Sequence, residues 1–131
     1  MICYCHAPDL LLAIICIHVP PAWTNGAKRN LFSSIRLAIP GGFKLLWIAA
    51  GDFNFGHDPC DISLDASHWS RTTRIPDATQ EAWHHSFPEC LELFQAQWTH
   101  RSAEGFTRLD RIYTGLPTTL LLDLKPVMDL D

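Results

Sequence analysis

The sequence has no apolar run long enough to cross a membrane as a helix. The run Leu10–Ile17 covers about half of the roughly 20 residues that such a helix needs. The residues before it include Asp9 but no Lys or Arg, and no small-x-small cleavage pattern follows, which argues against a signal peptide. We therefore expect a buried strand at this run and no membrane partner.

The cysteines lack the even number and regular spacing of a secreted disulfide framework. There are five of them, which favours reduced thiols and a location inside the cell, with the nucleus as one candidate compartment. A zinc site is one alternative, because His6 and His18 both have cysteines nearby. No standard two-plus-two ligand spacing appears, so zinc is the less favoured interpretation. The cysteines are Cys3, Cys5, Cys16, Cys60 and Cys90.

The chain also lacks the excess of positive charge that many nucleic-acid-binding domains carry. Lys and Arg number 10 against 14 Asp and Glu, which gives a net charge of −4. This weakens the case for a nucleic-acid binder without removing it, because local charge matters more than the sum. With 131 residues, of which 47% are apolar, the chain can bury a core, and we expect a single domain over residues 1–131.

Hydrophobic patterns and turn residues predict strands and helices in an order that indicates a layered α+β domain. Continuous hydrophobicity before Pro20 predicts a strand covered on both faces, and helical spacing follows it. Pro88 either breaks the second helix or opens a further helical turn that reaches Phe94. The polar segment His57–Pro76 is typical of a long loop. The predicted strands are Leu10–Val19, Phe43–Ala50, Thr107–Tyr113 and Leu120–Leu122, and the predicted helices are Ala27–Ile39 and Asp77–Phe87.

The most informative stretch is Leu46–Phe55, where an apolar run ends in Gly-Asp-Phe-Asn-Phe. Gly51 lets the backbone turn at the end of the predicted strand. Asp52 and Asn54 alternate with two phenylalanines, so period-two geometry places both polar side chains on one face. A carboxylate beside a carboxamide at a strand end can activate water, contact a cation and hold a phosphate oxygen. Hydrolysis of a phosphoester is therefore the first functional hypothesis.

Three segments resemble motifs of the endonuclease/exonuclease/phosphatase superfamily, in the family's order. Residues 14–20 are similar to the family's strand that ends in His or Tyr, and residues 48–54 match its Gly-Asp-Phe-Asn motif. Residues 107–113, Thr-Arg-Leu-Asp-Arg-Ile-Tyr, resemble its Ser-Arg-Leu-Asp-x-Ile motif. Taken with this last motif, Gln97–His100 looks most like the endonucleases of LINE-type retrotransposons.

The resemblance implies a partial four-layer α/β sandwich, in which two packed β-sheets are flanked by helices. The family places an Asn and a metal-binding Glu in strands before the region that matches Leu10, and a Ser-Asp-His segment near its end. Neither Met1–Asp9 nor Pro126–Asp131 supplies these residues. We therefore expect an interior fragment of a metal-dependent phosphodiesterase, with weak activity or none.

The resemblance also implies roles for four residues. Asp52 matches the aspartate that orients or deprotonates the attacking water, and Asn54 matches the asparagine that holds the scissile phosphate or the nucleophile. Asp110 matches the aspartate that binds the catalytic histidine, and His18 lies where the family has a phosphate-facing His or Tyr. Each residue also has a structural alternative. Asp52 could be a turn-capping aspartate, and Asn54 could form an Asx turn. Asp110 could be a surface aspartate paired with a neighbouring arginine, and His18 could be bonded to a nearby carbonyl.

For intact relatives, the resemblance implies a Mg²⁺ or Mn²⁺ cofactor and DNA as substrate, with Asp52 as one candidate metal ligand. Within Ser67–Arg74, Trp69 could stack on a base while Arg71 and Arg74 contact the backbone, although a solvated loop is the alternative. The rival functions are a non-catalytic nucleic-acid-binding or interaction fragment, and a relic of a retroelement with no independent function.

Overall fold

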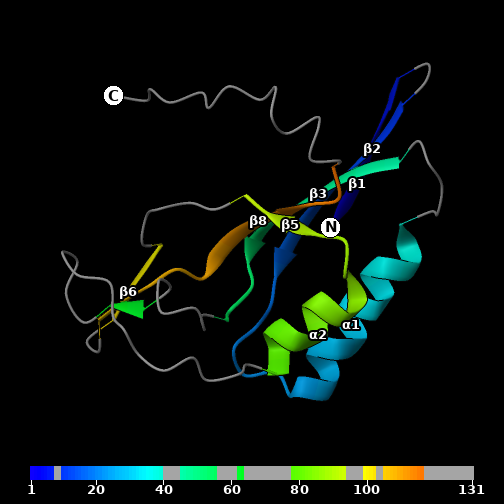
Figure 1. Ribbon diagram of the computed structural model, residues 1–131. Coiled ribbons are helices and arrows are strands. Elements are labelled where there is room, and N and C mark those ends of the chain that lie inside the picture. Colours follow the sequence, from blue (N-terminus) through cyan, green and yellow to red (C-terminus); the bar gives the residue numbers. More distant parts are fainter. Residues whose placement is uncertain are drawn as a thin grey trace, which may run out of the picture.

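The computed structural model describes residues 1–7, 10–39, 45–55, 62–63, 78–93, 99–102 and 105–116. These residues form an α+β fold, which confirms the predicted fold class (Figure 1). The helices are α1 (Asn25–Ala38) and α2 (Ala78–Ser86). The strands are β1 (Ile2–Ala7), β2 (Leu10–His18), β3 (Leu45–Asp52), β4 (Ile62–Ser63), β5 (Leu91–Glu92), β6 (His100–Ser102), β7 (Gly105–Thr107) and β8 (Asp110–Thr114).

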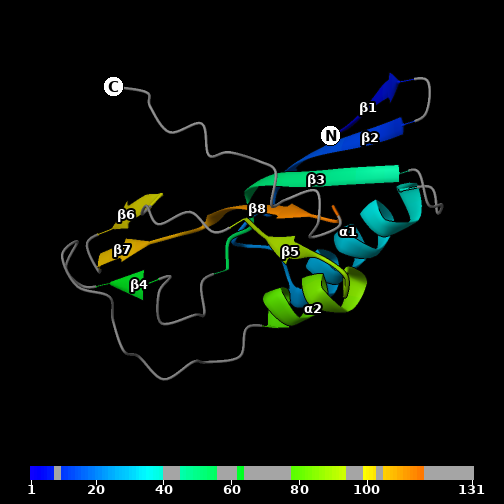
Figure 2. The same ribbon diagram turned by 45° about the horizontal axis from the view of Figure 1, so that its top comes forward.

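A five-stranded mixed sheet forms the centre of the described structure. Its strand order is β1-β2-β3-β8-β5, in which β2 and β3 are parallel and the other neighbours antiparallel. A smaller sheet of order β4-β7-β6 lies beyond one end of it, where β7 leads into β8 (Figure 2). In both views α1 and α2 lie together on one side of the large sheet. The two faces of this sheet therefore have different surroundings.

Successive residues of β2 point to these two faces in turn. Ile15 and Ile17 are buried toward the helices, and we call this side the helix-covered face. Ile14, Cys16 and His18 point the other way and are exposed. We call this second side the open face, because no helix or strand among the described residues covers it. The prediction of a strand covered on both faces is thus wrong, since a continuous apolar run does not reveal which of its faces is buried.

The helix-covered face holds an aromatic core. The Trp83 side chain of α2 is fully buried and contacts the rings of Phe32, Phe53 and Tyr113. The ring centroids are 4.9 to 5.3 Å apart in edge-on or tilted arrangements, which are the favourable geometries for aromatic pairs. These contacts join both helices to β3 and β8 and fix them on the sheet.

Both predicted helices are present, with bounds shifted by one or two residues. The Thr24 side chain accepts a hydrogen bond from Ala27 N at 3.3 Å and caps the start of α1. Helix α2 ends at Ser86, before Pro88, as one of the two alternatives predicts. The predicted cap of this helix, Asp77, lies outside the described residues. Neither described helix is long and apolar enough to cross a membrane.

Several strands differ from the prediction. Strand β1 was not expected, because its mixture of Cys, Tyr and His has no clear alternation of polar and apolar residues. Strand β5 follows Pro88 where the other alternative places a helical turn. The predicted strand Thr107–Tyr113 is interrupted at Arg108, so that β7 belongs to the small sheet and β8 to the large one.

Two predicted segments lie wholly or mostly outside the described residues. The predicted strand Leu120–Leu122 is one of them. The predicted loop His57–Pro76 is the other, and its described residues Ile62–Ser63 form β4 instead of loop. Strand β4 pairs with β7, so a pairing partner distant in sequence overrides the local irregularity.

Candidate active site

Three of the predicted catalytic residues lie side by side across the large sheet. His18 ends β2, Asp52 ends β3 and Asp110 begins β8. The strand registers pair His18 with Asp52, and Asp52 with Asp110. Because directly paired residues of neighbouring strands point to the same face, these side chains all belong to the open face. We call His18, Asp52 and Asp110 the open-face row.

Asp52 and Asp110 face each other at close range. The next pair along this ladder is hydrogen-bonded, since Phe53 N donates to Leu109 O at 3.0 Å. Hydrogen-bonded and non-hydrogen-bonded pairs alternate in an antiparallel ladder, so Asp52 and Asp110 form a non-hydrogen-bonded pair with Cα atoms about 4.5 Å apart. Two carboxylates directly opposite each other repel. The row therefore favours a group that brings a proton or positive charge.

His18 lies on the other side of Asp52. Its Nδ1 is 3.7 Å from Asp52 Oδ2, too long for a hydrogen bond but close enough for an ion pair when the imidazole is protonated. The His18 side chain is 68% exposed and that of Asp52 is 32% exposed, so solvent reaches both groups. The contact places one group that can carry a positive charge beside Asp52.

Gly51 allows the close approach of β2 and β3 that pairs Asp52 with His18. A Cβ atom at this position would lie 1.9 Å from the carbonyl oxygen of Ile17, and the backbone φ is +140°. Only glycine allows β2 to approach β3 this closely without strain. The expectation that Gly51 turns the chain is wrong, because β3 continues through it to Asp52.

Asn54 stabilises the turn that follows the row. Asp52 Oδ1 accepts a hydrogen bond from Asn54 N at 2.8 Å, and the Asn54 backbone is left-handed with φ of 48°. The Asn54 side chain donates from Nδ2 to Val19 O at 2.6 Å and so ties the ends of β3 and β2 together. Phe53 and Phe55 are buried. The predicted strand alternation does not reach Asn54, because β3 ends at Asp52 and the left-handed Asn54 backbone belongs to the turn. The turn-capping aspartate and the Asx turn, given above as structural alternatives, are thus both present.

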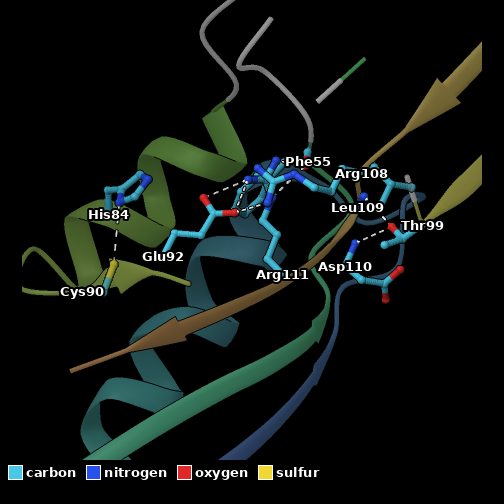
Figure 3. Close-up of polar contacts among 9 residues, drawn as sticks. All are labelled: Phe55, His84, Cys90, Glu92, Thr99, Arg108, Leu109, Asp110 and Arg111. Atoms are coloured by element: carbon cyan, nitrogen blue, oxygen red, sulfur yellow. Dashed lines mark hydrogen bonds and ion pairs between the residues drawn. The ribbon is translucent and has the colours of Figure 1, made fainter. Parts of the chain in front are cut away.

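A buried ion cluster lies on the opposite side of β8 from Asp110 (Figure 3). The Arg108 and Arg111 side chains are almost fully buried and both bind Glu92 of β5. Arg111 Nη1 is 3.1 Å from each Glu92 carboxylate oxygen. Arg111 also donates to the carbonyl oxygen of Phe55 at 3.0 and 3.3 Å. The cluster therefore fixes the chain that leaves the turn after Asp52.

The sequence alone does not reveal this cluster. Glu92 falls inside the alternative helical turn predicted after Pro88, whereas in the structure it belongs to a strand next to β8. The two arginines were expected only as surface partners of Asp110. One available signal is the alternation of a strand: Arg111 follows Asp110 directly, so the two side chains point to opposite faces.

Thr99 fixes the start of β8. Its Oγ1 accepts hydrogen bonds from Leu109 N and Asp110 N, both at 3.0 Å. Its own N–H donates to Thr107 O at 3.1 Å. Thr99 belongs to the segment Gln97–His100, which resembles the retrotransposon branch, but Thr99 itself was not predicted to have a role. The interaction holds Asp110 at the correct register beside Asp52.

The predicted nucleic-acid contacts cannot be placed relative to the row. Arg71, Arg74 and Trp69 all lie outside the described residues. The proposed base stacking by Trp69 and backbone contacts by the two arginines therefore stay predictions.

The residues of the row do not fit a resident Mg²⁺ or Mn²⁺ ion. Among the described residues, no group of three or more His, Cys, Asp or Glu side chains is arranged to hold a metal ion. Mg²⁺ needs a nearly octahedral set of oxygen ligands, and one Asp52 oxygen already accepts the Asn54 N–H. No chemical step is therefore assigned to a bound cation.

Two surface hollows are lined by residues that the structure describes. A cavity of about 390 Å³ lies between α1 and α2, with Arg29, Glu81 and His85 in its lining. It is on the helical side of the large sheet, away from the row. A smaller hollow of about 120 Å³ reaches His18 beside Met1. Of these two hollows among the described residues, the second adjoins a predicted catalytic residue, His18.

Comparison with known proteins assigns no family to the chain. It matches none of the protein-family models against which it was scanned, and no curated protein matches it. The resemblance to the endonuclease/exonuclease/phosphatase superfamily accordingly rests on the three sequence motifs.

Proposed function

We propose that the chain derives from a metal-dependent phosphodiester hydrolase of the endonuclease/exonuclease/phosphatase type, and that the open-face row is its hydrolytic site. The observation that carries the proposal is the register His18–Asp52–Asp110, which brings one residue from each of the three motifs together on neighbouring strands of one sheet. Asn54, the fourth matching residue, ties the same strand ends together. A partial four-layer sandwich is the corresponding proposal for the fold.

Asp52 is the proposed general base. Its Oδ1 is engaged by the Asn54 N–H, whereas Oδ2 faces His18 and solvent, so a water molecule can reach it. A base must lie within one hydrogen bond of the proton that it removes, and this geometry permits that contact with an attacking water. Protonated His18 would supply the positive charge next to the phosphate.

Weak activity follows from the charge of the row. A phosphodiester anion that approaches Asp52 and Asp110 meets two carboxylates, and the described residues offer no metal-binding group to offset them. Preorganised positive charge at a phosphoryl group is worth several kcal/mol of activation barrier, so its loss slows cleavage by orders of magnitude. We therefore expect little or no cleavage of DNA by this chain alone.

A plasmid-nicking assay tests the proposal. Supercoiled DNA is incubated with the purified chain and Mg²⁺ or Mn²⁺, beside the variants Asp52→Ala and Cys16→Ser. Cys16 lies on the same face of β2 and serves as the matched control. Any nicking should be weak, absent in Asp52→Ala and retained in Cys16→Ser. Robust nicking would contradict the expected weakness, and equal nicking by Asp52→Ala would contradict the hydrolytic role of the row.

The ancestry has an independent test in the genome. The sequence that adjoins the coding segment should contain an upstream Asn and Glu, a downstream Ser-Asp-His and a polymerase region beyond. Adjoining sequence of an unrelated kind would contradict the retrotransposon origin without bearing on the nicking assay.

The second candidate is a non-catalytic nucleic-acid-binding or interaction fragment. Exposed Ile14 and Cys16 on the open face favour it, because an apolar sheet face is a typical contact surface. DNA binding that weakens with salt, without any cleavage, would support this candidate over the hydrolase.

A further inference from the structure

We propose that β1 pairs with β1 of a second copy of this chain, antiparallel and centred on Tyr4. This arrangement extends the large sheet across the two copies. It also places Cys3 of each copy opposite Cys5 of the other. The proposal is independent of the hydrolytic site, because it concerns the outer edge of β1 and not the residues at the ends of β2, β3 and β8.

Strand β1 is an edge strand whose own residues carry none of the usual protections against pairing. It is the outermost strand of the five-stranded sheet, as Figure 2 shows. Its six residues include no proline and no Lys, Arg, Asp or Glu. Natural edge strands avoid association by being very short or by carrying charges or proline. The strand at the opposite edge, β5, has only two residues and ends in the charged residue Glu92. It therefore has the protections that β1 lacks.

The hydrogen bonds of β1 show which backbone groups face outward. Met1 N donates to Cys16 O at 3.0 Å, and Cys16 N donates to Met1 O at 2.9 Å, so Met1 and Cys16 form a hydrogen-bonded pair. Such pairs alternate along an antiparallel ladder, which turns the backbone of Cys3 and Cys5 toward β2. The N–H and C=O groups that point away from β2 therefore belong to the residues between them: Ile2, Tyr4 and His6.

These outward groups are complementary to a second copy of themselves. With a two-fold axis at Tyr4, the two Tyr4 residues bond each other and Ile2 bonds His6 of the other copy, which gives about six inter-chain hydrogen bonds. If the two-fold axis lay at Cys3, the outward backbone groups of His6 would have no partner in the other β1 strand. If it lay at Cys5, those of Ile2 would have none. No like charges oppose each other in the Tyr4 register, so a second copy of this chain is the partner that fits.

The same register brings two thiols together. Cys3 and Cys5 are exposed, and each would stand opposite the other in a non-hydrogen-bonded pair. The Cα atoms of such a pair are about 4.5 Å apart, which lies within the range of disulfide bonds. With oxidised glutathione as oxidant, two protein thiols become one disulfide and one glutathione disulfide becomes two thiols, so that electrons and protons balance.

Complementary cysteine variants test the register. In a chain with Cys16, Cys60 and Cys90 changed to Ser, oxidised glutathione should convert most of the protein to a covalent dimer on a non-reducing gel. In the same background, Cys3→Ser alone and Cys5→Ser alone should each give no covalent dimer on the gel, because each remaining thiol faces a serine. Mixing these two variants should restore the covalent dimer, because Cys5 of one then faces Cys3 of the other.

Three results would overturn the proposal. A covalent dimer of Cys3→Ser alone would show pairing centred on Cys5, and one of Cys5→Ser alone would show pairing centred on Cys3. Failure of the mixture to cross-link, with both variants folded by circular dichroism, would exclude the pairing altogether.

A backbone variant tests the pairing without thiol chemistry. Tyr4→Pro removes an outward N–H and leaves the β1–β2 ladder intact, since that N–H does not point toward β2. Sedimentation velocity should show a dimer for the unaltered chain and a monomer for Tyr4→Pro. Tyr4→Phe is the control, because it loses only the hydroxyl bond to Ala38 O and should remain a dimer. A folded Tyr4→Pro that is as dimeric as Tyr4→Phe would contradict the proposal.

Discussion

Carboxylate side chains have different surroundings on the two faces of the large sheet. On the helix-covered face, buried guanidinium groups are satisfied by a half-buried carboxylate, as Arg111 is by Glu92. On the open face, Asp52 and Asp110 stand opposite each other in reach of solvent, with no such compensation between them. Buried charges must be paired to be tolerated, whereas exposed like charges can be kept for chemistry. The contrast separates the groups that hold the fold from those that could act on a ligand.

Removing a carboxylate from the covered side should have the largest effect. Glu92→Gln removes the carboxylate that Arg108 and Arg111 share while both guanidinium groups stay buried, which should cost about 3–5 kcal/mol of unfolding free energy. Urea denaturation followed by tryptophan fluorescence measures this cost. A loss below about 1 kcal/mol would mean that the cluster behaves like a surface salt bridge, and the distinction between the two faces would fail.

Neighbouring isoleucines of β2 give a matched comparison of the two faces. Ile15 is 1% exposed and Ile14 is 38% exposed. Ile15→Ala should cost about 2–5 kcal/mol because it opens a cavity among the core residues, and Ile14→Ala should cost clearly less. Thermal and urea unfolding of both variants give the two values. Equal losses would show that another layer covers Ile14.

Thiols on the two sides should differ in reactivity. Burial raises the pKa of Cys90 from 9.0 to about 11, and nearby Glu89 and Glu92 act in the same direction. At pH 8 its thiolate fraction is then about 100-fold lower than that of a thiol with the ordinary value, and the thiolate is the reactive form. Native-state alkylation read by mass spectrometry should find Cys90 far slower than exposed Cys16, with its rate rising toward pH 11. Similar rates at pH 8 would contradict the burial of Cys90.

Removing a carboxylate from the open face should have the smallest effect, with the opposite sign to the loss of Glu92. Asp110→Asn relieves the repulsion from Asp52 and should stabilise the protein by about 0.2–1 kcal/mol at neutral pH. Destabilisation at neutral pH would show that Asp110 has a favourable partner.

The sequence predicts the elements whose patterns are local. Strand β2 and helix α1 follow from an apolar run before Pro20 and from helical spacing after it. The three residues of the open-face row are predicted together because the family resemblance names all of them. Composition alone does not single them out. Strand β1 is missed because pairing with β2, and not its own composition, makes it a strand.

Other features depend on contacts between distant segments. The predicted strand Thr107–Tyr113 is interrupted at Arg108 and Leu109, and the Arg108 side chain is buried against Glu92, which no local pattern indicates. The exposure of one face of β2 is not predicted, because an apolar run looks the same on both faces. Which face is buried depends on the helices and strands that pack against it. The role of Gly51 is misjudged for the same reason, since the close approach of Ile17 comes from another strand.

An engineered disulfide between residues 52 and 110 tests the central geometry most directly. In a chain whose five native cysteines are changed to Ser, Asp52→Cys/Asp110→Cys should form an intramolecular disulfide with oxidised glutathione, because directly opposed residues of a non-hydrogen-bonded pair are within bonding range. Asp52→Cys/Ile112→Cys, a diagonal pair about 7–8 Å apart, should not. A folded protein in which the first pair stays reduced, or in which the second closes as fast, would contradict the alignment of the row.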